Sequence, residues 1–445
     1  HVGRRRESGA AGRMFSPQSP MDTPSKQYDL EDPADPSWLK HRKHLFILSS
    51  AGKPIFSRYG DESKLAPLAG VLQALISFVR ESGDNIRHVV AGAHRVVFVT
   101  RGSLYLVAVS SSGESVPHLA RQLHCLHAQI ISILTSKVEA IFQRNASFDL
   151  RGLLGGTDRV LRSLIREGSG QPTMLLGATP CLRMPAPTRA ELGRLLAATR
   201  PTSLLFGVLL ARGFLVQLWR TKKTPLHPQD LLVVMNTVNS SASFREDESW
   251  LPLCLPRFND RAMLFAHVSF VAPELCLVLL TPAADAFEPL SLCRQQVVHR
   301  LQQTEALRGP LFRAVAQPQY DVEEAAAAEV RHFLYRVAAH AQFTAPRTGP
   351  NAGPQCPYRD RAAVKQLLRR YQHVHERVHA SSKPLREYLV TTDSETIVAW
   401  TNSEHELYVV LGPLVSKPVA IAASHKLLRW LKKEHATLFF APVAK

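Results

Sequence analysis

The chain has 445 residues, of which 45% are hydrophobic and 20% charged, and its formal net charge is +17. This ordinary globular composition excludes wholesale disorder and fibrous repeats, and at roughly 150 residues per domain the length predicts about three domains. The excess of Lys and Arg over Asp and Glu is compatible with three kinds of partner: nucleic acid, an anionic membrane surface or an acidic protein. Six cysteines without a CxxC pair or regular spacing indicate reduced, mostly buried thiols of a cytosolic protein.

The amino-terminal segment, residues 1–43, is predicted to be a disordered leader. It combines three consecutive arginines, Arg4 to Arg6, with Ser-Pro and Thr-Pro dipeptides. Few large apolar side chains are present there to offset the entropy lost on ordering. Its Ser-Pro sites suit phosphorylation, and the alternative is a proline-rich tail without a regulatory role.

Residues 44–167 follow a pattern of strands and helices that defines one unit. Apolar runs, helical spacing and turn residues predict strands 45–48 and 55–57, helix 65–79, strands 86–91, 95–100 and 104–109, one long helix 116–143 and a helix 150–166. Short gaps between the last three strands make them antiparallel neighbours, since a crossover needs more residues. Their faces are apolar on both sides, so the sheet needs a helix on each face. The unit is therefore a ββαβββα sandwich of three layers.

The same order of elements recurs twice further along the chain. We therefore predict an α/β protein of three tandem domains, each an antiparallel sheet between helices, and no membrane span, because no run of about 18 uninterrupted apolar residues occurs. The predicted segments are the leader 1–43, domain one at 44–167, a linker at 168–202, domain two at 203–307, a linker at 308–330 and domain three at 331–445.

One motif resembles a zinc protease helix. His375-Glu376-Arg377-Val378-His379 matches HExxH, in which two histidines one turn apart bind zinc and the glutamate serves as general base. A charged residue lies between the ligands, and no HxxGxxH extension follows. We therefore expect no catalytic metal here, and stoichiometric zinc in purified protein would overturn that expectation. His124, Cys125 and His127 are likewise expected to be ordinary helix residues.

Motifs for phosphate binding and covalent catalysis are missing from the sequence. No GxxxxGK[ST], GxGxxG or GxSxG is present. We therefore predict no catalytic residues, no metal ligands and no cofactor.

The basic residues concentrate in the predicted third domain. Residues 331–445 hold 17 Lys and Arg against 8 Asp and Glu, a net +9. Two helices there are expected to carry basic faces opposite their apolar stripes, formed by Arg369, Arg370, His373 and Arg377, and by Lys426, Arg429, Lys432 and Lys433. Such faces suit docking on an anionic cytoplasmic leaflet, at about 1 kcal/mol per basic residue. The alternative is that both faces are simply solvated.

Several stretches between residue 43 and the carboxyl terminus carry a family resemblance. They are KHLFILSSAGKPIFSRYG (43–60), LQAL (72–75), SFDLR (147–151), LLGG (153–156), LHP (226–228), SFRE (243–246), CLPRFN (254–259) and RHFLY (331–335). In this order they closely resemble the Mon-one family of vacuolar and lysosomal fusion proteins. Among the mammalian paralogues, the B form is the expected match.

The resemblance implies a fold and a function. Family members contain three longin domains, which have the ββαβββα order, and pair with a second tri-longin subunit, Ccz-one. The pair acts as guanine nucleotide exchange factor for the late-endosomal Rab GTPase and drives endosome maturation and lysosomal fusion. Exchange involves no covalent chemistry: the first domains of both subunits bind the empty Rab and remodel its switch I, so that nucleotide is released.

The resemblance also implies partners and a location. We expect the Ccz-one subunit, the Rab, a third regulatory subunit and an anionic or phosphoinositide membrane as partners, and no nucleic acid. The protein would be cytoplasmic and recruited peripherally to late endosomes and lysosomes. By position, the hairpin of the first domain is expected to face the Rab or the partner, through Lys53, Pro54, Ile55, Ser57, Arg58, Tyr59 and Gly60. The alternative is a hairpin that merely turns the chain.

Two other functions remain open from the sequence. A trafficking adaptor built from the same domains would bind a Rab or cargo without exchange activity. A nucleic-acid-binding protein would exploit the charge of +17, but only 7% of residues are aromatic. Stacking platforms interleaved with Lys and Arg are therefore not evident, and this function is the least favoured.

Overall fold

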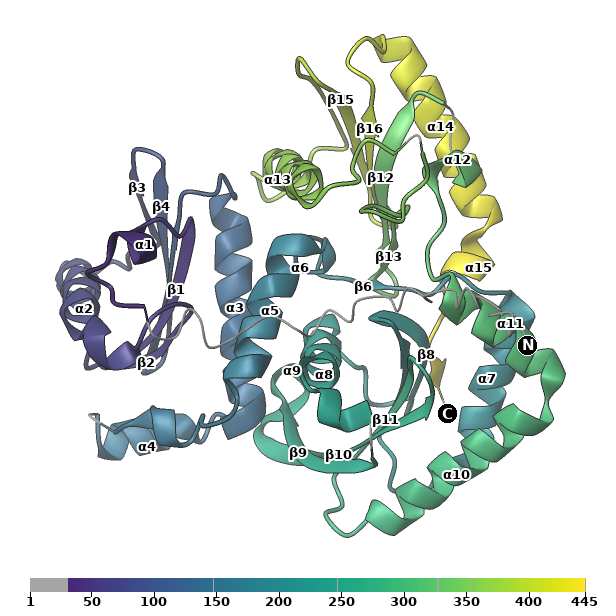
Figure 1. The fold of residues 1–445 in the computed structure, drawn as a ribbon, viewed down its shortest axis with the longest axis horizontal. Coiled ribbons are helices and arrows are strands. Elements are labelled where there is room, and N and C mark those ends of the chain that lie inside the picture. The colour runs from purple at the N-terminus through teal and green to yellow at the C-terminus, as the bar shows by residue number, and fades with distance from the viewer. Residues whose placement is uncertain (1–30, 147, 246, 326–327, 355, 445) are drawn as a thin grey trace, which may run out of the picture.

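The computed structural model describes residues 31–146, 148–245, 247–325, 328–354 and 356–444. The predicted disorder of residues 1–30 lies outside these ranges. The described chain forms three β-sheets, each with helices on both faces, and each domain follows the order ββαβββα (Figure 1). The predicted fold class is thereby confirmed.

The first domain has a five-stranded antiparallel sheet in the order β2-β1-β5-β4-β3. Helix α2 covers its outer face and helix α3 its inner face (Figure 1). The elements are β1 (Lys43–Ser49), β2 (Pro54–Ser57), η1 (Glu62–Leu65), α2 (Ala66–Glu81), β3 (His88–Ala91), β4 (His94–Arg101), β5 (Leu104–Ser110), α3 (Val116–Leu134), α4 (Val138–Arg144), η2 (Leu150–Gly152) and α5 (Asp158–Gly170).

The prediction of one long helix at 116–143 is wrong, because α3 and α4 are separate helices that meet at 85°. Thr135 ends α3 with a positive φ of 63°, which a helix cannot continue. The N–H of the next residue, Ser136, donates to the carbonyl of Asp260 at 2.7 Å. The second domain thus takes up a backbone donor that a continuous helix would have used itself.

The leader predicted at residues 1–43 extends too far, because residues 31–43 are folded. They include α1 (Pro36–Leu39), whose Trp38 is buried. The indole Nε1 of Trp38 donates to the carbonyl of Tyr59 at 3.1 Å, and its ring lies against His44 and Phe46. A single large aromatic side chain therefore anchors a segment that is otherwise polar.

The second domain has a sheet in the order β17-β8-β7-β11-β10-β9. Helix α8 packs on one face, and α7, α10 and α11 pack on the other. Its elements are β7 (Phe206–Ala211), β8 (Phe214–Arg220), α8 (Pro228–Ser240), η3 (Ala242–Arg245), β9 (Ser249–Leu255), α9 (Pro256–Asn259), β10 (Asp260–Ala272), β11 (Leu275–Thr281), α10 (Phe287–Gln303) and α11 (Glu305–Ala316).

The third domain has a sheet in the order β14-β15-β16-β12-β13-β6, between α13 and α14. Its elements are α12 (Val322–Ala325), β12 (Val330–Val337), β13 (Gln342–Thr344), α13 (Arg361–Val378), β14 (Glu387–Thr391), β15 (Thr396–Thr401), β16 (His405–Leu411), α14 (Lys417–Lys433) and α15 (His435–Leu438).

The second and third domains exchange edge strands. Strand β6 (Thr179–Pro180) precedes the second domain yet pairs in parallel with β13 of the third sheet. Strand β17 (Val443–Ala444) follows the third domain yet pairs in parallel with β8 of the second. Residues 168–202, expected as a linker, contain α6 (Thr173–Leu176), β6 and α7 (Ala186–Thr199). The buried leucines of α7, at helical spacing, pack onto the second sheet.

Arg189 on α7 stabilises the arrangement of the exchanged strands. Its guanidinium is buried and donates to three carbonyls: Val216 on β8 at 2.9 Å, Leu182 at 2.5 Å and Thr437 at 3.0 Å. It also lies over the ring of Phe440, 4.8 Å from the ring centre. Thr437 lies on α15 at the end of the third domain and Phe440 follows it, so one side chain ties the connector and the carboxyl-terminal segment to the second sheet.

We predict that Arg189→Met lowers the melting temperature by about 6–12 °C. Hydrogen bonds to a charged group contribute roughly 1.5–3 kcal/mol each, and carbonyls left buried without a donor add to the loss. About 3 kcal/mol corresponds to that shift for a unit of 150–250 residues. Differential scanning fluorimetry measures it.

The matched control is Arg194→Met on the same helix. Arg194 is exposed, and among the described residues its salt bridge is with Glu191, three residues earlier, at 2.5 Å. Exposed pairs contribute about 0–1 kcal/mol, so this variant is expected to melt within about 3 °C of the wild type. Equal melting temperatures for the two variants would show that Arg189 does not hold the exchanged strands.

Candidate functional site

The hairpin expected to face a partner is only partly a surface. Ile55 and Ser57 on β2 and Gly60 beyond it are buried, with Ile55 in the core shared with α3. The other predicted contact residues, Lys53, Pro54, Arg58 and Tyr59, are half-exposed. Ile55, Ser57 and Gly60 are therefore not open to a partner in this chain, because β2 lies on the sheet with its apolar side chains inward.

The half-exposed hairpin residues contact other parts of the first domain. The ring of Tyr59 stacks on His41 with 3.8 Å between centres, and the Arg58 guanidinium lies 4.9 Å from the centre of the Tyr59 ring. Gly60 has φ +80°, and a Cβ there would lie 2.8 Å from the carbonyl of Glu31. Lys53 pairs with Asp149 at 3.4 Å. The turn is thus fastened by neighbouring segments, and its role in docking stays a prediction.

A buried ion pair lies at the start of this hairpin. Lys43 Nζ donates to Glu114 Oε1 at 2.8 Å and to the side chain of Gln122 on α3. Burial lowers the pKa of Lys43 to about 8, against the opposing effect of Glu114. Burial alone would raise the pKa of Glu114, but the charge and hydrogen bond of Lys43 outweigh it and hold that pKa at about 2. Both groups are therefore charged at neutral pH. The pair ties β1 to the segment before α3, and the bond to Gln122 ties β1 to α3 itself.

Helix α2 presents an apolar stripe to the outside. Val71, Leu75 and Phe78 are spaced i, i+4, i+7, and their exposed fractions are 58%, 44% and 75%. The opposite side of the helix packs on the sheet through Ala69, Leu72 and Ile76. The sequence predicted no membrane span, but the segment Glu62–Glu81 is long and apolar enough to cross a membrane by length and composition alone, and only 22% of its most apolar window is buried. The second stripe at helical spacing is the signal that would have found this surface.

Strand β3 gives the same domain an open edge. It is the last strand of the first sheet, and all four of its residues are exposed, including Val89 and Val90. An exposed apolar edge strand offers unpaired backbone groups to another chain. The first domain thus carries two features typical of a protein interface.

The two predicted basic faces have different environments. Lys426, Arg429, Lys432 and Lys433 on α14 are all exposed, and within the described residues none of them forms a salt bridge. In the loop before α14, Leu414 is 98% exposed. This helix therefore combines four free cations with a projecting apolar side chain.

The face of α13 is not a free basic surface, which corrects the prediction for that helix. Arg370 forms an ion pair with Glu395, whose side chain is buried. His373 Nε2 lies 3.2 Å from the carbonyl of Gly113 in the first domain, and Arg369 lies beside the same glycine. The helix docks against the first domain there, so Arg377 is the one clearly exposed arginine of the predicted set.

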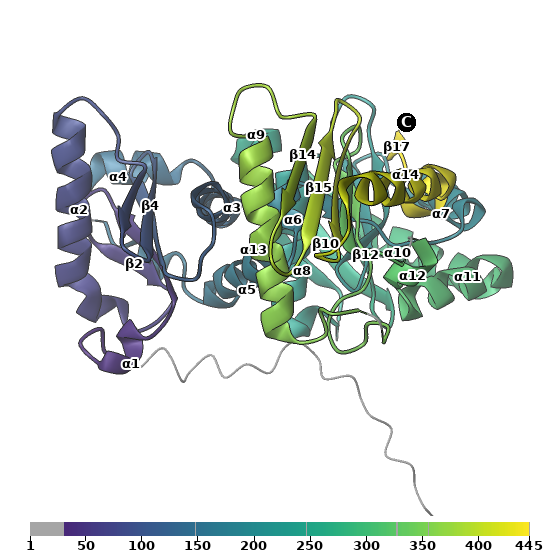
Figure 2. The same ribbon diagram turned by 90° about the horizontal axis from the view of Figure 1, so that it is seen from above.

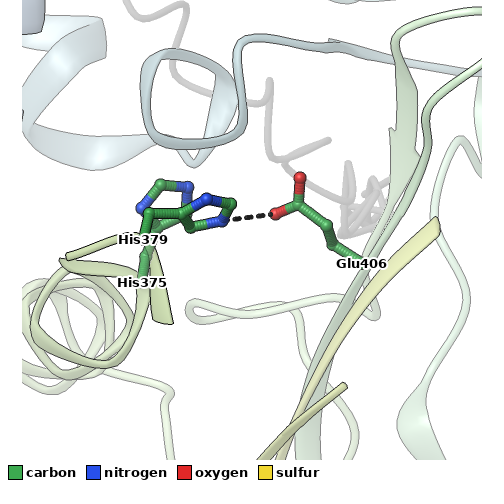
Figure 3. Close-up of side chains that lie close together, drawn as sticks. All are labelled: His375, His379 and Glu406. Carbon is green, nitrogen blue, oxygen red and sulfur yellow. Dashed lines mark hydrogen bonds and ion pairs between the residues drawn. The ribbon is translucent and has the colours of Figure 1, made fainter. Parts of the chain in front are cut away.

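The HExxH segment brings its two histidines to a residue outside the motif. His375 and His379 face Glu406 on β16, across the third domain (Figure 3). The motif's own Glu376 lies 3.9 Å from His373 instead. The arrangement therefore lacks the position that a zinc protease gives its general base.

Comparison with protein families identifies the class of all three domains. Residues 43–164 match the family described as "First Longin domain of FUZ, MON1 and HPS1", residues 202–299 match the second longin domain of that description, and residues 329–435 match the third. The protein is therefore a tri-longin protein.

Whole-chain relatives narrow the class to a family. The chain is 38% identical to vacuolar fusion protein MON1 homolog A of Bos taurus, 39% to homolog A of Homo sapiens and 36% to homolog B of Homo sapiens. Each match covers 97% of this chain, and 77%, 65% and 82% of the relative, respectively. The chain belongs to the MON1 family. The identities to forms A and B are too similar to decide between them, and the B form stays a prediction.

We predict that Glu114→Gln destabilises the first domain by about 3 kcal/mol at neutral pH, because it leaves the Lys43 ammonium buried without its counter-charge. Glu114 has a folded pKa of about 2, below its ordinary 4.5, so its contribution is present above pH 4.5 and is lost as the pH falls toward 2. Urea unfolding at several pH values measures both effects, and the variant should lose less stability on acidification than the wild type.

The control for Glu114 is Asp149→Asn, which removes the acid from the exposed pair with Lys53. Solvent screens this pair, and the expected cost is under about 1 kcal/mol. A loss for Glu114→Gln no larger than this control would contradict a structural role of the buried pair.

Proposed function

We propose that this chain is one subunit of a heterodimeric guanine nucleotide exchange factor for the late-endosomal Rab GTPase, with a Ccz-one protein as partner. It would act on late-endosomal and lysosomal membranes in endosome maturation and fusion, and a third, regulatory subunit would join the pair. The observation that carries this proposal is the exposed apolar stripe on α2 of the first longin domain. Family membership supports the trafficking role.

The α2 stripe and the β3 edge suit a second longin domain as the partner. Phe78 is 75% exposed, and an aromatic side chain that buries its area in a partner is a common interface hot spot. A partner longin domain would offer the same two features, an outer helix and an edge strand. Two such domains can therefore pair with each other through like surfaces.

Exchange by such a pair is a binding process. A protein that binds the nucleotide-free Rab more tightly than the loaded form lowers the barrier to nucleotide release. The half-exposed side of the β1–β2 hairpin, with Lys53, Arg58 and Tyr59, is the surface we assign to contact with the Rab. It has two cationic groups and an aromatic ring on a fixed turn. A fixed turn limits the entropy lost on binding.

We predict that the complex with the Ccz-one subunit accelerates release of a fluorescent guanine nucleotide from the Rab, and that Phe78→Asp reduces this at least tenfold at subunit concentrations near the dissociation constant. Loss of a hot spot costs 2 kcal/mol or more, and about 1.4 kcal/mol is a factor of ten. Stopped-flow fluorescence measures release, and gel filtration measures assembly.

The control is Leu292→Asp on α10 of the second domain, an apolar side chain of similar exposure (54%) away from the proposed interface. It should assemble and exchange like the wild type. An intact wild-type complex that binds the Rab without accelerating release would support the adaptor function instead.

We further propose that α14 docks the protein on an anionic membrane. Its four exposed cations favour phosphatidylserine or phosphoinositide head groups, at about 1 kcal/mol each near the surface. Leu414 adds an apolar side chain that can enter the interfacial region. The basic residues of α13 are left out of this site, since Arg369, Arg370 and His373 face protein groups.

We predict that Lys432→Glu with Lys433→Glu lowers binding to phosphatidylserine vesicles at least tenfold, because two attractive charges become repulsive. Vesicle flotation at physiological salt measures it. Exchange on a soluble Rab should be unchanged.

The matched control is Lys222→Glu with Lys223→Glu, two exposed neighbouring lysines after β8 in the second domain. Equal losses from both pairs would mean that net charge, and not α14, governs binding. Salt-resistant retention of RNA on filters, without vesicle binding, would favour the nucleic-acid function.

A further inference from the structure

The third domain contains a cluster of two imidazoles and one carboxylate that no function above uses. His375 and His379 lie one turn apart on α13, and Glu406 extends toward them from β16 (Figure 3). The potential ligand atoms of all three lie within 4.8 Å of one another. Two separate elements of the fold therefore converge on one point.

The spacing of the donor atoms fits a small metal ion. In tetrahedral zinc sites the Zn–N and Zn–O distances are about 2.0–2.2 Å, which places two ligand atoms roughly 3.3–3.5 Å apart. His379 Nε2 and Glu406 Oε2 are 3.4 Å apart. The ring of His375 stacks on that of His379 with 4.1 Å between centres. The donor atom of His375 lies within 4.8 Å of the other two.

The surroundings hold the ligands as the neighbours of a metal site would. Arg336 Nη1 donates to Glu406 Oε1 at 2.8 Å, which leaves Oε2 directed at the histidines, and the hydroxyl of Tyr408 donates to Oε2 at 2.9 Å. Ligating carboxylates are commonly oriented by such hydrogen bonds. His375 is buried, with 6% of its surface exposed, and water competes poorly there.

Two nearby cations work against a metal ion. Arg336 pairs with Glu406, and the charge of Arg121, on α3 of the first domain, acts on both Glu406 and His375. Their repulsion weakens binding relative to a cysteine-rich structural site. It does not change the donor set, which is one that zinc uses in proteins.

Against the expectation from the sequence that the chain has no metal ligands, we propose that His375, His379 and Glu406 bind one zinc ion, with a fourth position left for water. The ion would join α13 to β16 and so stiffen the side of the third domain that faces α3. The ion would link these two elements and not serve a protease, because Glu376, the residue a protease would need at the metal, lies beside His373.

The test uses tag-free full-length chain, stripped with a chelator and dialysed against zinc sulfate. Mass spectrometry of the metal content should give one zinc per chain. His379→Asn and Glu406→Gln should each reduce this to the buffer level, and zinc should raise the melting temperature of the wild type but not of these variants. His379 is only half-buried, so its replacement is the less disruptive of the two.

The matched control is Glu376→Gln, which changes the HExxH motif but not the proposed ligands. It should keep one zinc per chain and the zinc-dependent rise in melting temperature. The proposal is overturned if the wild type holds no zinc above buffer, or if folded His379→Asn, checked by circular dichroism, holds as much zinc as the wild type.

Discussion

Helix α3 is buried from two sides, and this packing decides which surfaces of the protein stay free. Its apolar residues join the core of the first domain, and that core extends to Leu232 on α8 and Cys254 on β9 of the second. The fully buried Gln129 accepts a hydrogen bond from Asn236 at 2.9 Å. Because the inner face of the first sheet is used in this way, α2 is the helix left on the outside. The exposed stripe of α2 is a consequence of the docking of α3.

Local patterns predicted the elements, and long-range contacts decided where the predictions failed. Helical and alternating spacing gave the ββαβββα order three times, because each element buries one face. The break at Thr135 depends on a carbonyl 125 residues further along the chain, that of Asp260, which no window of sequence reveals. The folded structure of residues 31–43 likewise depends on a distant partner, because the Trp38 indole donates to the carbonyl of Tyr59. Such partners become visible only in the folded protein.

The candidate sites were predictable to different degrees for the same reason. A basic face can be read from helical spacing, and α14 has the expected one. The equally basic spacing of α13 gave no hint that Glu395 and the carbonyl of Gly113 would occupy it. Similarly, HExxH spacing places two histidines on one side of a helix, but the carboxylate that faces them, Glu406, comes from a strand and belongs to no motif.

The positions of α2 and α14 allow the two proposed surfaces to be used together. Figure 2 shows α2 at one end of the molecule and α14 toward the other, with α3 and α13 between them. A membrane bound by α14 would therefore leave α2 and β3 open to a partner subunit. Between the two surfaces, α13 contacts the first domain through His373 and the third sheet through its buried face. Any ligand that stiffens the contact of α13 with β16 would thus act on one of the contacts of the first domain, beside the packing of α3 on the second domain.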